Sequence, residues 1–344
     1  MPLPLIPAIV AIATAGGVAH GAKKGIEAKQ DMDRAKSINS SAKNIADRAE
    51  KSIETTKELT KKAICNLGEE KIRILSSSIN DFVIYYEKIK NMTLIEGEGI
   101  DELKNFNPSS ESFKKLKDVS FEAKDMAVNG VAAVGAGALL AFGTYNVVMG
   151  GLGGLLVTAT TGTALSTLSG VAATNATLAW LGGGALSVGG LGIAGGTLVL
   201  GGLVIGPALA IGGSVFAKQA KTALNDAHSN MDKARTFESQ ARNIVLSLNN
   251  IQRRANQLKD LLKNLDKNFL IEVEKLKYII NNYGNDWRTY SIGQKQDIFR
   301  CVKYAQVIKV ILDTPLLKEN GELDKNSEKI LKEGQNKLQE LKGI

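Results

Sequence analysis

The chain has 344 residues and a formal net charge of +8, from 43 Lys and Arg against 35 Asp and Glu. It contains two histidines and two cysteines, and its sequence shows no spacing typical of a metal site, a disulfide framework or a phosphate-binding loop with Gly-Lys-Ser/Thr. Residues 190–195 match the dinucleotide-binding fingerprint by letter, but no acid follows before Asp226 to hold a ribose, so we reject that match. This composition argues against an enzyme and against a cofactor or metal site, because no paired groups for general acid–base catalysis are evident. We interpret Cys65 and Cys301 as free thiols, with a single bridge between them as the alternative.

The first 22 residues form an apolar N-terminal segment without Lys, Arg, Asp or Glu. Prolines within the first seven residues restrict a helix to Ala8 onward. A secretory signal would carry basic residues before its apolar core, whereas Lys23 is the first base and follows that core. We therefore interpret residues 1–22 as a short helix that packs on other apolar helices. Export is the alternative, because residues 13–15 read Ala-Thr-Ala, like a cleavage site.

Residues 23–125 are predicted to form a first helical arm. Small and apolar side chains recur there at steps of three or four, which places them along one face of a helix. The members of this stripe are Ala35, Ile38, Ala42, Ile45, Ala49, Ile53, Thr56, Leu59 and Ala63. Gly, Pro and Ser gather in residues 96–112, so we expect a hinge or exposed loop there, followed by an amphipathic segment at residues 113–125.

Residues 126–217 are the most unusual part of the chain, with 92 residues and no Asp, Glu, Lys, Arg or His among them. They hold 23 of the 35 glycines. About 20 apolar residues suffice to cross the hydrocarbon core of a bilayer, so this charge-free block has room for several crossings. We predict that the block inserts into a membrane as two to four helical segments, a number that the sequence leaves open.

Small residues recur four apart within this block, where they share a helix face and let helices approach closely in lipid. Chance pairs arise easily where one residue in four is Gly, but several pairs together favour a packing surface. The predicted packing residues are Gly150, Gly154, Ala179, Gly183, Gly192, Gly196, Gly202 and Gly206, with Trp180 beside them. Trp180 suits the headgroup level of a bilayer and, equally, the interior of a packed bundle.

Residues 218–283 are predicted to form one long coiled-coil helix. Their apolar residues alternate at steps of three and four, which gives the period of 3.5 that is typical of a coiled-coil seam. The seam consists of Ala241, Ile244, Leu248, Ile251, Ala255, Leu258, Leu262, Leu265 and Phe269. Residues 284–344 form a C-terminal helical region, with helices expected at residues 292–312 and 324–341 after a turn at residues 282–286.

These elements together predict an all-α fold. Its core would be a long antiparallel coiled-coil hairpin that flanks the Gly-rich membrane-inserting block, because an even number of crossings returns both arms to one side of the bilayer. Residues 1–125 carry a net charge of +1, whereas residues 218–344 carry 23 Lys and Arg against 16 Asp and Glu, a net +7. That basic excess favours attraction to anionic lipid headgroups.

The block contains Ala173-Thr174-Asn175-Ala176, followed by Leu178-Ala179-Trp180-Leu181-Gly182-Gly183-Gly184. With these residues, the stretch Thr161–Ala217 resembles a recurrent block of bacterial glycine-zipper membrane proteins, mostly of unknown function. The resemblance covers about one sixth of the chain and implies membrane residence. The wider layout is similar to apolipoprotein L proteins and to cytolysin A type helical pore-forming proteins. That similarity implies insertion of the central region and ion-conducting assemblies, although a cytolysin tongue is much shorter than 92 residues.

The sequence therefore predicts a protein that inserts into a bilayer, forms a homo-oligomer and permeabilises or depolarises the membrane. A pore-forming toxin and a bacterial antiviral defence effector both fit this prediction. The alternative is a resident membrane scaffold or tether whose coiled-coil arms bind partner proteins. The expected location is the bacterial inner membrane, or a target membrane that the protein enters from solution. No nucleic-acid partner is expected, because Lys and Arg alternate with acids and do not interleave with aromatic residues.

Overall fold

A computed structural model describes residues 18–92, 106–128, 139, 220–317 and 322–343 of the chain. Every regular element in these residues is helical, which confirms the predicted all-α class. The elements are α1 (Val18–Ile74), the π-helix η1 (Leu75–Ile79), α2 (Asn80–Tyr86), α4 (Glu111–Val128), α9 (Ala220–Tyr283), the 3-10 helix η5 (Trp287–Thr289), α10 (Ile292–Leu312) and α11 (Asn326–Lys342). Two helices dominate, with 57 residues in α1 and 64 in α9.

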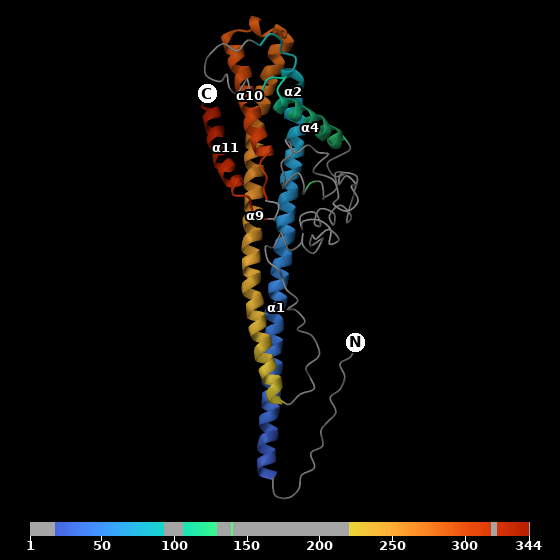
Figure 1. Ribbon diagram of the computed structural model, residues 1–344, viewed down its shortest axis with the longest axis vertical. Helices are drawn as coiled ribbons and strands as arrows, with labels where there is room; N and C mark the ends of the chain where they lie inside the picture. Colours follow the sequence, from blue (N-terminus) through green and yellow to red (C-terminus); the bar gives the residue numbers. More distant parts are fainter. Residues whose placement is uncertain (1–17, 93–105, 129–138, 140–219, 318–321, 344) are drawn as a thin grey trace. The chain divides into compact units, whose positions relative to one another are not determined.

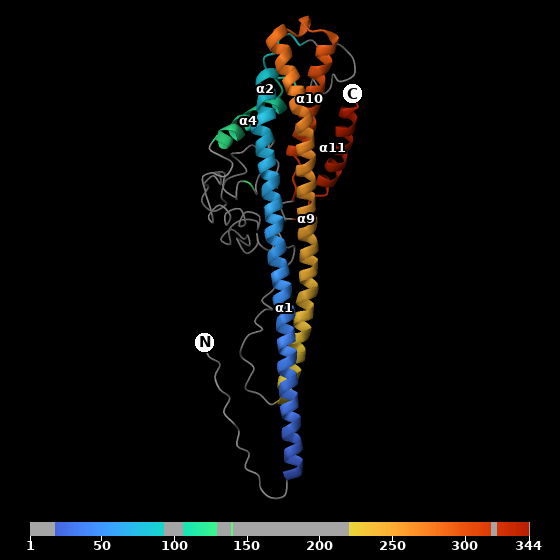
Figure 2. The same ribbon diagram turned by 180° about the vertical axis from the view of Figure 1, so that it is seen from behind.

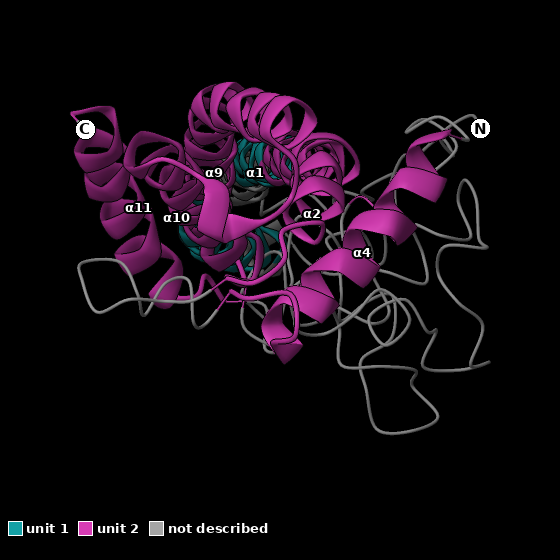
Figure 3. Ribbon diagram, turned by 90° about the horizontal axis from the view of Figure 1, so that it is seen from above, with its two compact units in different colours: residues 1–52, 205–243 teal, residues 53–204, 244–344 magenta. Residues whose placement is uncertain are grey.

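The chain divides into two compact units, each of which draws residues from both halves of the sequence (Figure 3). Unit 1 comprises residues 1–52 and 205–243, and unit 2 comprises residues 53–204 and 244–344. Both α1 and α9 therefore contribute their first parts to unit 1 and their remainder to unit 2.

Unit 1 packs α1 against α9 through small side chains. Its buried residues are Ala35, Ala42, Ala46 and Ala49 on α1, and Ala227, Ala234, Phe237 and Ala241 on α9. The side-chain amide of Asn230 donates a hydrogen bond to Oδ1 of Asn39 over 3.0 Å. Alanine buries little apolar area, so each pair of residues stabilises unit 1 only weakly.

In unit 2, α1 and α9 lie side by side and run parallel (Figures 1 and 2). The hydroxyl of Thr60 donates to the carbonyl of Leu248 over 3.2 Å, and farther along both helices Nη2 of Arg73 contacts Asp266 at 2.7 Å. Both residue numbers rise together from one contact to the next, as only parallel helices allow. The predicted antiparallel pairing is therefore wrong. A heptad seam reads the same in either direction, and the 91 residues between α4 and α9 are long enough to carry the chain back.

Helices α10 and α11 pack along α9 in unit 2. Helix α9 contains no Gly or Pro and ends at Tyr283, just before Gly284, whose φ of +78° is readily adopted only by glycine. A capping box between Ser291 and Gln294 then starts α10. Its bounds, Ile292–Leu312, are those predicted from the sequence. After a second turn, α11 lies against both α9 and α10.

Candidate functional site

The site of interest is the point where the charge-free block joins described structure. Residues 126–128, the first of the block, form the last turn of α4, and Val128 there is 79% exposed. Helix α4 packs on η1 and α2 within unit 2. We call α4, η1 and α2 together the block base, because they fix the position from which the block departs.

An aromatic cluster holds the N-terminal half of α4 in the block base. The ring of Phe82 on α2 stacks with Tyr86 at a centroid separation of 5.1 Å. Phe113 of α4 meets both rings, at 6.3 Å from Phe82 and 5.7 Å from Tyr86. Phe106 and Phe269 complete the cluster from the loop before α4 and from α9. Offset and edge-to-face contacts of this kind add to the stability gained from buried area.

Polar contacts hold the C-terminal half of α4. The ammonium of Lys124 donates to Oδ1 of the fully buried Asn80 over 2.9 Å. The amide of Asn80 also points at the hydroxyl of Ser120, at 3.5 Å, which is the long limit for a hydrogen bond. Nearer the middle of α4, Lys117 forms an ion pair with Glu87 at 2.7 Å.

The π-helix η1 joins this base to α9 through a buried carboxylate. Asp266 of α9 is 1% exposed, and it accepts a hydrogen bond from Arg73 over 2.7 Å and another from the hydroxyl of Ser78. Arg73 also pairs with Glu70 one turn earlier at 2.6 Å. These two carboxylates raise the pKa of the Arg73 guanidinium and keep it charged.

A second buried charged side chain is that of Lys71 on α1, whose ammonium group meets the C-terminal end of α10. Its ammonium donates to the carbonyl of Leu312 over 3.3 Å, and the side chain is 1% exposed. Burial lowers the pKa of Lys71 to about 7, and the nearby carboxylate of Asp313 offsets only part of that shift. A cation beside the last carbonyls of a helix is favourable, which explains why the fold accepts the buried ammonium of Lys71 at the end of α10.

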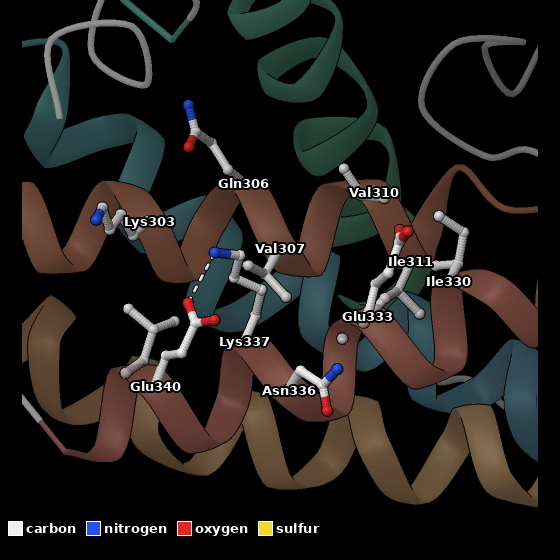
Figure 4. A pocket seen from close by; sticks show the side chains of 12 residues that line it. Lys303, Gln306, Val307, Val310, Ile311, Ile330, Glu333, Asn336, Lys337 and Glu340 are labelled. Atoms are coloured by element: carbon white, nitrogen blue, oxygen red, sulfur yellow. Dashed lines mark hydrogen bonds and ion pairs between the residues drawn. The ribbon is translucent and has the colours of Figure 1, made fainter.

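Helix α11 approaches α9 and α10 closely at Gly334. A Cβ atom on this glycine would come within 2.9 Å of Leu261 and 3.1 Å of Ile311. On the outer side, α10 and α11 border a groove of about 520 Å³ whose apolar lining includes Val307 and Ile330 (Figure 4). Its charged lining residues are the bases Lys303 and Lys337 and the acids Glu333 and Glu340. The groove therefore does not select a ligand of either charge.

All nine predicted seam residues, from Ala241 to Phe269, are buried. Ala241 belongs to unit 1 and the other eight belong to unit 2. The predicted membrane-packing residues, from Gly150 to Gly206 and including Trp180, lie outside the described residues. Neither Cys65 nor Cys301 forms a disulfide, and burial raises the pKa of the Cys65 thiol to about 11.

Lys71, Asn80 and Asp266 were not among the functional residues predicted from the sequence. The burial of Lys71 could have been predicted from the sequence, since Lys71 continues the helical stripe of Ile64 and Leu67 on α1, and both of those residues are fully buried. Asp266 directly follows a seam residue, where an acid at the edge of a helix interface is ordinary. Nothing in the sequence pairs Asn80 with α4.

Within the described ranges, none of the helices is both long and apolar enough to cross a membrane. The same residues contain no group of three or more His, Cys, Asp or Glu that could hold a metal ion. Comparison of the chain with protein-family models, with curated proteins and with solved structures finds no match.

Proposed function

We propose that this protein inserts its charge-free block into a lipid bilayer, oligomerises there and permeabilises or depolarises the membrane. The observation that carries the proposal is the run of 92 residues without Asp, Glu, Lys, Arg or His. A side chain with a charge is costly inside hydrocarbon, so a chain that is 23% charged as a whole is expected to exclude such residues over this length only where they meet lipid. A toxin and a bacterial antiviral defence effector are the classes of protein that fit.

The basic excess of residues 218–344 supports the first step, binding to the bilayer. Each Lys or Arg near an anionic surface contributes on the order of 1 kcal/mol, so a net +7 concentrates the protein on such membranes. In the second step, glycines four apart provide the surfaces on which inserted segments associate. Repetition of these contacts between copies would produce the homo-oligomer.

The parallel pairing of α1 and α9 in unit 2 changes how insertion must work. In an antiparallel hairpin the block would be the tip that joins the two arms, and it could enter a bilayer end-on. Here the block departs from the end of α4, and the chain returns to the beginning of α9. Insertion of the block therefore involves the long connection between α4 and α9 and not the tip of a two-helix hairpin.

The test is dye release by the purified full-length chain from liposomes of phosphatidylglycerol and phosphatidylcholine, with pure phosphatidylcholine liposomes for comparison. We expect release from the anionic liposomes and weaker release from the neutral ones. The double variant Gly192→Val/Gly196→Val places bulk on one predicted packing face and should reduce release. Ala194→Val, which adds the same bulk on another face, serves as the matched control.

Two results would redirect the proposal. Absence of release, together with membrane fractionation from synthesis onward, would favour a resident scaffold whose helical arms bind partner proteins. Absence of both release and liposome binding would refute membrane insertion altogether.

A further inference from the structure

The apolar packing of α4 against the rest of unit 2 becomes weaker from the beginning of the helix to its end. In the first half, Phe113 is 1% exposed and Leu116 is fully buried, and a buried aromatic ring removes roughly 150–250 Å² from water. In the second half, the buried side chains are Val119, Ser120 and Ala123, which are all small. The end of α4 that leads into the charge-free block is therefore the end that apolar packing holds least.

The contact between Lys124 and Asn80 compensates for this weak packing. It joins an ammonium on the last turns of α4 to a fully buried amide oxygen over 2.9 Å. Lys124 itself is exposed, so this hydrogen bond can break without leaving a buried charge behind. Breaking it frees the ammonium to meet water or an anionic surface.

The π-helix η1 fixes the position of the amide in this contact. Asn80 directly follows η1, and its backbone N–H donates to the carbonyl of Leu75, five residues earlier. Two residues before it, Ser78 bonds to Asp266 on α9. Residues two apart on a helix face in nearly opposite directions, so the wide turn ties α9 on one side and α4 on the other. Single π turns inside long helices occur often at functional sites.

We propose that α4 is a latch with a fixed pivot. Its first half stays anchored in the aromatic cluster, and its second half, from Val119 to Val128, lifts from η1 and α2 when the contact between Lys124 and Asn80 breaks. The role of the latch in regulating membrane insertion rests on the proposed function. Lifting this half would release the start of the charge-free block. The lifting motion itself is a property of unit 2 and can be measured without lipid.

Amide hydrogen exchange on the soluble full-length protein tests the motion. Lys124→Ala should speed exchange over residues 119–128 by about fivefold, which corresponds to the roughly 1 kcal/mol that a hydrogen bond contributes. Lys115→Ala is the matched control, since Lys115 is on the same helix and pairs with Glu111 of that helix at 2.8 Å. Equal exchange over residues 119–128 in the two variants would overturn the latch.

A reversible clamp tests its consequence. In a Cys65→Ser/Cys301→Ala background, Asn80→Cys/Ser120→Cys is bridged with a short bis-methanethiosulfonate reagent to close the latch. Because both positions are fully buried, the reagent reaches them only when α4 lifts, so labelling is carried to completion before release is measured. Glu87→Cys/Lys117→Cys places the same bridge near the pivot. The latch bridge should block dye release until dithiothreitol removes it, and the pivot bridge should leave release intact. Release that persists with the latch bridged would refute the regulatory role.

Failure of the two proposals can be distinguished. If the unbridged protein with native cysteines releases no dye, the proposed function fails, and hydrogen exchange still decides whether α4 is a latch. If the double-cysteine variants do not fold, Lys124→Ala should still release dye faster than Lys115→Ala. Equal rates for those two variants would count against the latch.

Discussion

Replacement of Lys71 by Met should stabilise the protein at neutral pH. Lys71 is 1% exposed and donates a hydrogen bond of 3.3 Å to the carbonyl of Leu312. Methionine has a similar length, is flexible and has no charge, so it can fill the same space. The carboxylate of Asp313 keeps its ion pair with Lys309 at 2.6 Å when the ammonium of Lys71 is removed. The substitution therefore deletes a buried charge and leaves no new one unpaired.

The magnitude follows from the pKa. Burial lowers the pKa of Lys71 from its ordinary value of 10.5 to about 7, so the folded protein binds this proton less tightly than the unfolded chain does. The resulting penalty at pH 7 is on the order of 4 kcal/mol. Loss of the hydrogen bond offsets about 1 kcal/mol of the gain. We expect Lys71→Met to raise the free energy of unfolding by roughly 2–3 kcal/mol at pH 7.

The same linkage predicts a pH dependence with a definite sign. Between pH 7 and pH 10.5 the unfolded chain holds a proton at Lys71 that the folded protein has lost, so stability from this group rises with pH. Below about pH 7 both states are protonated and the full penalty is present. Urea unfolding at pH 6, 7.5 and 9 should show a wild type that gains stability and a Met variant that gains less.

Lys62→Met is the control, because Lys62 is exposed on the same helix. It should leave the pH dependence of the wild type unchanged. A Lys71→Met variant that is less stable than the wild type at every pH, with the same pH dependence, would refute the reasoning. Lys71 would then stabilise the fold as a cation that caps α10.

Two further predictions concern packing in unit 2. Asp266→Ala removes a buried partner of Arg73. It should lower the free energy of unfolding, measured by urea titration, by roughly 2–3 kcal/mol, and not by more because the Arg73 guanidinium is partly exposed. An unchanged unfolding midpoint would show that the pair contributes nothing to stability. Gly334→Leu forces a side chain against Leu261, where even a Cβ atom would lie at 2.9 Å. It should lower the free energy of unfolding by roughly 2 kcal/mol and detach α11, which faster amide hydrogen exchange in α11 would show. Gly293→Leu, at a glycine with no atom within 4 Å of the added Cβ, should be neutral or stabilising, and equal effects of the two changes would contradict the close approach.

Helix positions were accessible from the sequence because the pattern and the end signals are local. Helix α10 has the predicted bounds, and α4, Glu111–Val128, extends the amphipathic segment expected at residues 113–125 by only a few residues. The burial of the seam residues follows from the same kind of information, since a period of 3.5 aligns side chains along one face whatever they face.

The charge-free block is likewise a property that the sequence determines by itself, because the absence of Asp, Glu, Lys, Arg and His over 92 residues needs no structure to be seen. The direction of pairing is different. A seam is symmetric with respect to chain direction, and a long connection costs only slightly more entropy than a short one, so neither feature selects antiparallel helices. Only the tertiary structure decided that α1 and α9 run parallel in unit 2.

Tertiary structure alone also decided which polar residues are buried. Lys71, Asn80 and Asp266 sit on helices whose sequences resemble any amphipathic arm, and their burial arises from α10, α4 and α1 packing over them. Whether a polar side chain faces water depends on what the neighbouring element covers, and that element is distant in sequence. The sequence thus determined the helices and the block, and the packing of helices remote in the chain decided the contacts of the block base.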